Sequence, residues 1–247
     1  MRPHQVGWIA AAVLSAACSR NPEPMPHRSI DQLVDTTDPG MAVVKEWISS
    51  ASNKVELLAV DPAAGRRALL ALQVTSRSPM GALALESGGM LIDDGWVRVL
   101  GGGHERLPRT LDTWNRLGDP PHRLPGAILV GDDVLGAFFA LNGGGIPGPP
   151  GHVFYYAPDS LEWEEVAASY SDWIQGLLQG DLEQFYGDQR WNDWRDEVRQ
   201  LPGDRAFSIY PPLFAEGPPI GERARRPVPL LELWGLHVGE VPKQLGR

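Results

Sequence analysis

The stretch AILVGDDVLGAFFALNGGGIPGPPGHVFYYAPDSLEWEEV, residues 127–166, decides the fold. Short apolar and aromatic runs alternate in it with turns made of Gly, Pro and Asp, which is the pattern of antiparallel strands joined by hairpins. Strands are therefore predicted at residues 127–130, 135–141, 152–157 and 161–166. Asp132 and Asp133 are assigned to the first turn, because adjacent acidic residues commonly form hairpin turns.

The segments on either side add helices and further strands. Apolar residues at helical spacing predict helices at residues 41–50, 62–73, 80–85, 170–179, 191–201 and 229–236. Residues 90–100 are predicted as a hairpin that turns at Asp93 and Asp94, and residues 207–210 as a short strand. Residues 55–60 fit either a helix or a strand. The order of these elements predicts an α+β fold with a mostly antiparallel sheet and helices packed on one side.

The helix at residues 170–179 is expected to cover the strands at 135–141 and 152–157, which should be antiparallel neighbours. Alternation along each strand leaves one apolar face, and the helix offers an apolar stripe to bury against it. The side chains expected to meet are Phe139, Leu141, Phe154 and Tyr156 from the strands and Trp173, Leu177 and Leu178 from the helix.

The N-terminus has the pattern of an export signal. Arg2 precedes a charge-free apolar run at residues 6–17 that is too short to span a bilayer, so residues 1–18 are predicted to be a signal peptide. The run ends in LSAAC and resembles the lipobox of bacterial lipoproteins, in which the cysteine, here Cys18, is lipidated. Cleavage nearby by ordinary signal peptidase, or a buried N-terminal helix with an inert Cys18, are the alternatives. Residues 19–38 are predicted to be a flexible tether and residues 39–247 a single domain.

Composition excludes some classes of function. The chain has 247 residues and a formal net charge of −9, which argues against a nucleic-acid groove or a polybasic membrane patch because both need clustered cations. A chain of this length can bury a core without disulfides or metals. Cys18 is its only cysteine, as suits an exported protein that avoids stray thiol pairing.

Several phrases of the sequence resemble a known bacterial family. They are SPMGALAL, GWVRVLGGGH, LPRTL, DDVLGAFFALNGG, FYYAPDSLEWE and RRPVPLLELWG. Together they are similar to domain-of-unknown-function family 2625 over about residues 39–245, and the order of elements resembles the SUKH superfamily. That resemblance implies a SUKH-like α+β domain and a role like that of immunity proteins, which bind and neutralise bacterial toxins. It implies no shared catalytic set, and an export signal departs from the usual cytoplasmic immunity protein.

Residues that carry chemistry do not form a recognisable set in the sequence. His104, His122, His152 and His237 lack the spacing of a zinc site, and GGGHER at residues 101–106 lacks the Lys-Ser/Thr ending of a phosphate-binding loop. We therefore predict no catalytic residues, no metal ligands and no cofactor.

The leading hypothesis is a non-catalytic lipoprotein that binds a protein partner at the periplasmic face of the outer membrane; a secreted or soluble periplasmic protein is the alternative. Asp132, Asp133, Trp191 and Trp194 are candidate partner contacts, although the helical spacing of the two tryptophans favours a place in the core. The competing functions are a cell-envelope enzyme acting on carbohydrate or cell-wall material, which needs two facing carboxylates, and a small-ligand carrier, which needs an enclosed apolar pocket.

Overall fold

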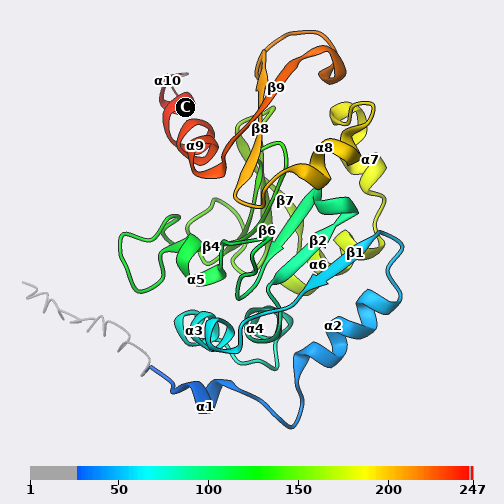
Figure 1. Ribbon diagram of the computed structural model, residues 1–247. Helices are drawn as coiled ribbons and strands as arrows, with labels where there is room; N and C mark the ends of the chain where they lie inside the picture. The colour runs from blue at the N-terminus through cyan, green and yellow to red at the C-terminus, as the bar shows by residue number, and fades with distance from the viewer. Residues whose placement is uncertain (1–26, 245, 247) are drawn as a thin grey trace, which may run out of the picture.

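A seven-stranded antiparallel sheet lies at the centre of the structure, a computed structural model that describes residues 27–244 and 246 (Figure 1). The strands pair in the order in which they follow one another along the chain. They are β1 (Val55–Leu58), β2 (Gly89–Ile92), β3 (Val97–Leu100), β4 (Ala127–Asp133), β5 (Phe138–Asn142), β6 (Val153–Ala157) and β7 (Glu162–Ala167). The predicted α+β class with an antiparallel sheet is confirmed, and residues 55–60 supply its edge strand β1.

The turn between β4 and β5 lies further along the chain than the sequence predicted. Asp132 and Asp133 belong to β4, where they pair with Arg98 and Val97 of β3, and residues 134–136 form the turn instead. Gly136 has a φ of +76°, a left-handed conformation that glycine adopts without steric cost. The prediction was wrong because it treated both aspartates as solvent-exposed turn formers, whereas their carboxylates have buried partners.

Four helices form a layer in which α4 (Pro79–Glu86) contacts each of the other three, α2 (Gly40–Ser49), α3 (Pro62–Leu72) and α6 (Tyr170–Gln179). The start of α4 follows the predicted signal, since the Ser78 hydroxyl accepts a hydrogen bond from Gly81 N–H and Pro79 is the first helical residue. Trp173 of α6 packs on Phe139 of β5 with 5.2 Å between ring centroids. The prediction that α6 covers the β5–β6 pair is confirmed.

The faces of that strand pair were assigned only half correctly. Phe139 pairs with Tyr155, and Ala140 pairs with Phe154. Phe154 therefore lies on the opposite face from Phe139, and so does Tyr156, because successive residues of a strand alternate between faces. The alternation was read correctly within each strand, but the register between the strands depends on the loop of residues 143–152, whose geometry the sequence does not fix.

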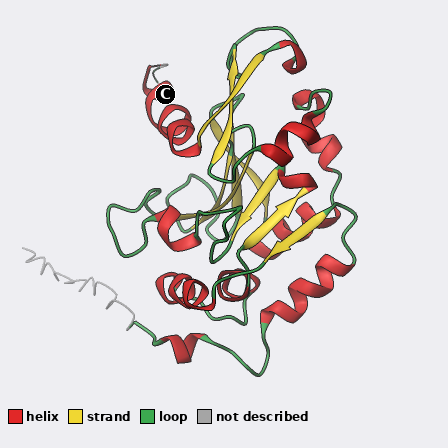
Figure 2. Ribbon diagram, viewed as in Figure 1, coloured by secondary structure: helices red, strands yellow, loops and turns green. Residues whose placement is uncertain are grey.

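A C-terminal unit covers the other face of the sheet. Its strand at residues 207–210 and its helix at residues 229–236 were predicted, but their assembly into one unit was not. It contains the antiparallel pair β8 (Arg205–Tyr210) and β9 (Ala224–Pro229), joined through a 3₁₀ turn η3 (Ile220–Glu222), and a C-terminal helical segment. That segment consists of α9 (Leu230–Trp234), the π-helical turn η4 (Gly235–Glu240) and α10 (Val241–Gln244). Trp234 packs edge-on against Phe138, 4.9 Å between centroids, on the opposite side of β5 from Trp173. Figure 2 shows the hairpin and this segment standing at one end of the molecule.

The region between α6 and β8 folds around Trp96, which follows the 3₁₀ turn η1 (Asp93–Gly95). It contains α7 (Leu182–Tyr186), a 3₁₀ turn η2 (Gly187–Gln189) and α8 (Trp194–Gln200). The helix predicted for residues 191–201 begins only at Trp194, because Asp193 has a left-handed φ of +61° and interrupts it. Trp191 and Trp194 nevertheless both pack on Trp96, at 5.6 and 4.8 Å between centroids.

The described N-terminal residues pack onto the domain. Helical turn α1 (Ile30–Leu33) buries Leu33 completely, and Arg28 N–H donates to the Gln73 side chain at 2.8 Å. Residues 28–33, which were expected to lie in a flexible tether, therefore pack against the domain, because Leu33 supplies an apolar anchor that composition alone did not reveal. The predicted signal peptide and Cys18 lie outside the described residues. Within the described part of the chain, no helix is long and apolar enough to cross a membrane.

A short helix, α5 (Leu111–Asn115), is hydrogen-bonded to the middle of the central sheet. It ends beside β4, and the Asn115 side chain exchanges two hydrogen bonds with the backbone of Leu129, accepting at 2.7 Å and donating at 2.8 Å. This pair of bonds ties the middle of β4, at the bulge next to Leu129, to the helix.

Candidate functional site

Asp132 is buried between two arginines. Its carboxylate is fully inaccessible to solvent and lies 2.6 Å from Arg98 Nη2 and 2.5 Å from Arg109 Nη1. These arginines also donate to backbone carbonyls of a single segment: Arg98 to Arg205 at 2.5 Å and Arg109 to Gly203 at 2.8 and 3.0 Å. The Asp132 cluster therefore fixes the start of β8 to the central sheet.

Asp133 is buried in a separate set of hydrogen bonds. Its Oδ1 accepts from the N–H groups of Leu135 and Ala137 at 2.9 and 3.2 Å, and its Oδ2 accepts from the Tyr155 hydroxyl at 2.9 Å. Burial raises the pKa of Asp133 to about 6, although the hydrogen bonds oppose that shift. Asp132 and Asp133 thus hold the fold together, and neither can contact a partner directly.

The two candidate tryptophans are also buried. Trp191 and Trp194 expose only 4% and 5% of their surface and form an aromatic cluster with Trp96 and Tyr186. The guanidinium of Arg190 lies within this cluster, 4.4 Å from the Trp194 ring, and forms an ion pair with Asp93 at 2.6 Å. The structure therefore places both tryptophans in the core.

The histidines lie apart from one another. His152 Nδ1 is 2.8 Å from Glu165 Oε1 across the β6–β7 pair, whereas His104 Nδ1 accepts from the Arg106 N–H. His237 lies in the C-terminal helical segment. Across residues 27–244 and 246, no three His, Cys, Asp or Glu residues come together in a way that could hold a metal ion.

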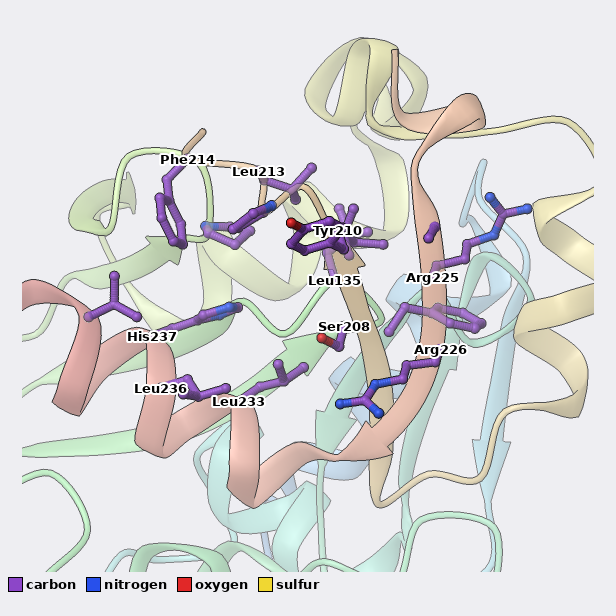
Figure 3. Close-up of a pocket in the computed structure, with 16 residues that line it drawn as sticks. Leu135, Ser208, Tyr210, Leu213, Phe214, Arg225, Arg226, Leu233, Leu236 and His237 are labelled. Carbon is purple, nitrogen blue, oxygen red and sulfur yellow. The ribbon is translucent and has the colours of Figure 1, made fainter. Parts of the chain in front are cut away.

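A groove runs between β8 and the C-terminal helical segment (Figure 3). Its volume is about 420 Å³, within the range of about 300–1,000 Å³ usual for ligand sites. Leu233, Leu236 and His237 line one wall, and Ser208 and Tyr210 line the other. Leu213 and Phe214, from the proline-rich loop that follows β8, lie at the upper end.

Exposed apolar side chains border this groove. Tyr210 exposes 73% of its surface, a large fraction for an aromatic residue, and Leu236 exposes 40%. Their position beside a concave apolar surface is typical of recognition sites, where aromatic residues supply most of the contact energy.

Two polar groups give the groove its chemical character. Arg226, which pairs with Ser208 across the β8–β9 hairpin, is exposed and has no ion-pair partner within residues 27–244 and 246. Figure 3 shows its side chain directed below Ser208 towards the helical wall. Opposite it, His237 Nδ1 lies 3.2 Å from the Gly136 carbonyl oxygen, so this nitrogen carries the proton and Nε2 is left as an acceptor. Burial lowers the pKa of His237 and so favours the neutral form of the ring.

The neighbouring arginine has a different environment. Arg225 lies on the other face of β9, where it donates to both carboxylate oxygens of Glu197 at 2.7 and 2.9 Å and stacks on Trp191. Consecutive arginines in one strand thus have separate roles: Arg225 fixes the hairpin to α8, and Arg226 supplies charge to the groove.

Sequence reasoning did not find the groove. The phrase RRPVPLLELWG, residues 225–235, was noted for its family resemblance and for the helix predicted from residue 229, and its two arginines carry no motif that separates a structural from a binding role. The alternation rule, applied to a strand at 224–229, was the available signal, because it places Arg225 and Arg226 on opposite faces. Residues 207–210 were predicted as a strand, but their partner strand was not recognised.

Comparison with known proteins identifies relatives without assigning an activity. The model of a family described as protein of unknown function DUF2625 matches residues 30–233. A putative uncharacterized protein, YbfG, of Escherichia coli strain K12 is 42% identical over 207 residues, covering 84% of this chain and 94% of that protein. An uncharacterized protein of Haemophilus influenzae is 36% identical over 188 residues, covering 75% of this chain and 82% of its own length. No solved structure matches the chain.

The matched range begins at α1 and ends within α9, so it includes the central sheet, the helical layer and the β8–β9 hairpin. The chain therefore belongs to the DUF2625 family.

Proposed function

We propose that this protein is a non-catalytic binding module whose groove between β8 and the C-terminal helical segment receives part of a protein partner. The observation that carries the proposal is the combination, in a groove of about 420 Å³, of exposed apolar side chains with Arg226, which has no ion-pair partner among the described residues. An exposed apolar surface with one fixed charge favours a partner of matching shape and opposite charge.

The acidic residues of the central sheet support a non-catalytic role. An enzyme acting on carbohydrate needs a pair of carboxyl groups that face a cleft. Asp132 is instead buried between Arg98 and Arg109, and Asp133 is buried beneath Tyr155. Both carboxylates are occupied by contacts within the fold, and a substrate has no access to them.

The proposal includes export and lipid anchoring. The charge-free run that ends in LSAAC supports lipidation of Cys18, and Ser19 resembles the residue type that lets lipoproteins move on to the outer membrane. The first described residues and α1 lie at the opposite end of the molecule from the β8–β9 hairpin (Figure 1). An anchor before residue 27 would therefore join the domain at the end away from the groove, which leaves the groove accessible to a periplasmic partner.

The SUKH-like relationship is part of the same proposal. It is supported by the order of the elements, in which the strands of the sheet are followed by α6, a helix capped at its start by Ser169. Immunity proteins of that superfamily act by binding other proteins, so the relationship fits a partner-binding groove.

A small-ligand carrier is the second candidate. It is favoured by the volume of the groove and by the acceptor at His237 Nε2 opposite Arg226, since a few placed polar groups in an apolar site are typical of small-molecule recognition.

Affinity capture from the protein's own cells tests the function. We compare the wild-type protein with Ser208→Trp, which fills the groove, and with Leu70→Trp, a change on α3 at a residue 41% exposed and outside the groove. We expect a stoichiometric protein partner with the wild type and Leu70→Trp and its loss with Ser208→Trp. Equal recovery with all three proteins would show that the groove is not the binding site.

A further inference from the structure

The backbone at the free edge of β8 lies in the groove. Phe207 pairs with Pro227, which has no N–H, and the Phe207 N–H donates instead to Val134 O at 2.7 Å, away from β9. In an antiparallel pair, every second residue directs its N–H and C=O to the same side. Ile209 is two residues further on, so its N–H and C=O also point away from β9, and neither has a hydrogen bond outside the strand pair within the described residues.

This free edge is short and has two defined ends. Val134 occupies it at Phe207, and Pro211, the residue after Tyr210, ends it because proline has no N–H to offer. An extended peptide added beside Ile209 can therefore form one pair of backbone hydrogen bonds. It cannot continue past Phe207, where Val134 already fills the position.

Arg226 lies close to the blocked end. It pairs with Ser208, which stands between the blocked Phe207 and the free Ile209. The Arg226 guanidinium, which has no ion-pair partner in the part of the chain that the structure describes, attracts a carboxylate and can bind it with two parallel hydrogen bonds. A carboxylate placed there would coincide with the point at which an added strand has to stop.

The walls of the groove offer places for the side chains of such a strand. Alternate residues of an added strand would point towards Leu233 and Leu236 of the helical wall, while their neighbours would point towards Tyr210. These walls favour apolar side chains in the last residues of the peptide.

We propose that the groove binds the C-terminal end of a partner polypeptide, held as an extended strand against Ile209 with its terminal carboxylate on Arg226. This inference rests on the proposed function and adds the chemistry of the segment that is recognised. An internal Asp or Glu of a partner would present the same charge but would require the chain to continue past Val134.

Binding of defined peptides tests the inference. A randomised library of synthetic hexapeptides with free C-terminal carboxylates, and the same library with C-terminal amides, are applied to the immobilised full-length protein, and the retained peptides are measured individually. We expect the wild type to retain free-acid peptides with apolar final residues. The corresponding amides should bind with an affinity lower by about tenfold or more, as expected for the loss of a charge-assisted contact.

Two variants separate a role in binding from a role in folding. Arg226→Gln should bind the free-acid peptides more weakly than the wild type by the same factor, about tenfold. It should also bind the acid and the amide of each peptide equally. Arg67→Gln, a change at an exposed arginine of α3, should bind as the wild type does. Thermal unfolding of each variant shows that the domain remains folded.

The inference is overturned if acids and amides bind equally, if Arg226→Gln retains the preference for acids, or if neither library contains a binder. These results are distinct from failure of the proposed function. A captured partner that is lost with Ser208→Trp would still establish the groove as its binding site.

Discussion

Replacing Asp132 by Ala should destabilise the domain more than any change of a surface charge. The substitution leaves Arg98 and Arg109 in the interior with exposures of 2% and 7% and without the carboxylate that lies within 2.6 Å of both. Removing one partner of a buried ion pair typically costs about 3–5 kcal/mol, because the remaining charge is desolvated without compensation. Two cations remain here, so we expect a loss near the upper end, about 5 kcal/mol.

The same change should loosen the start of β8. Arg98 and Arg109 bind the carbonyls of Arg205 and Gly203, and their reorientation towards water would release that segment. Hydrogen exchange of backbone amides in β8 should therefore rise more than in β2, which lies in the sheet away from the cluster.

Urea unfolding followed by tryptophan fluorescence measures the effect, because the aromatic cluster around Trp96 reports on tertiary packing. The control is Asp31→Ala, which removes an exposed ion pair with Arg66 and should cost about 0–1 kcal/mol. An Asp132→Ala protein within 1 kcal/mol of the control would refute the account of the buried cluster.

Three further predictions follow from other parts of the chain. Burial raises the pKa of Asp133 from 3.8 to about 6 in the folded protein, so the stability that this group contributes below about pH 4 should be lost as the pH rises through about 6, by about 3 kcal/mol. Urea titrations at a series of pH values measure this loss, and Asp133→Asn should flatten the dependence of stability on pH between about 4 and 6. Trp194→Ala should cost about 3–5 kcal/mol in the same assay, because it empties a buried site between Trp96 and Arg190; a loss under 1 kcal/mol would show that the cluster is not tightly packed. Cys18→Ala should move the protein from the membrane fraction to the soluble fraction, and continued membrane association with unchanged gel mobility would contradict lipid anchoring.

Local signals predicted the elements of the sheet better than its register. The Ser78-Pro79 helix start, the Gly-rich ends of the hairpins and the alternation in HVFYYA each depend on neighbouring residues, and each yielded the correct element. The register of β5 against β6 depends on the long loop of residues 143–152, and an error of one position there moved Phe154 and Tyr156 to the other face.

The predicted roles of Asp132 and Asp133 were wrong for a related reason. Asp132 and Asp133 have the appearance of turn residues until Arg98, Arg109 and Tyr155, which are 22 to 34 positions away, are placed beside them. The groove was not predicted, since it depends on the pairing of β8 with β9 across residues 211–223 and on the Phe207 contact with Val134. Interactions between distant segments of this kind leave no local pattern.

The claim that the protein acts by binding a partner in the groove is tested most directly by photo-crosslinking in living cells. A photoreactive amino acid is placed at Tyr210, which borders the groove, or at Val43 of α2, which is also exposed (40%) but lies in the helical layer. We expect one discrete crosslinked protein from position 210, lost when Ser208→Trp fills the groove, and no such product from position 43. Absence of a product at position 210, or the same products from both positions, would contradict the claim.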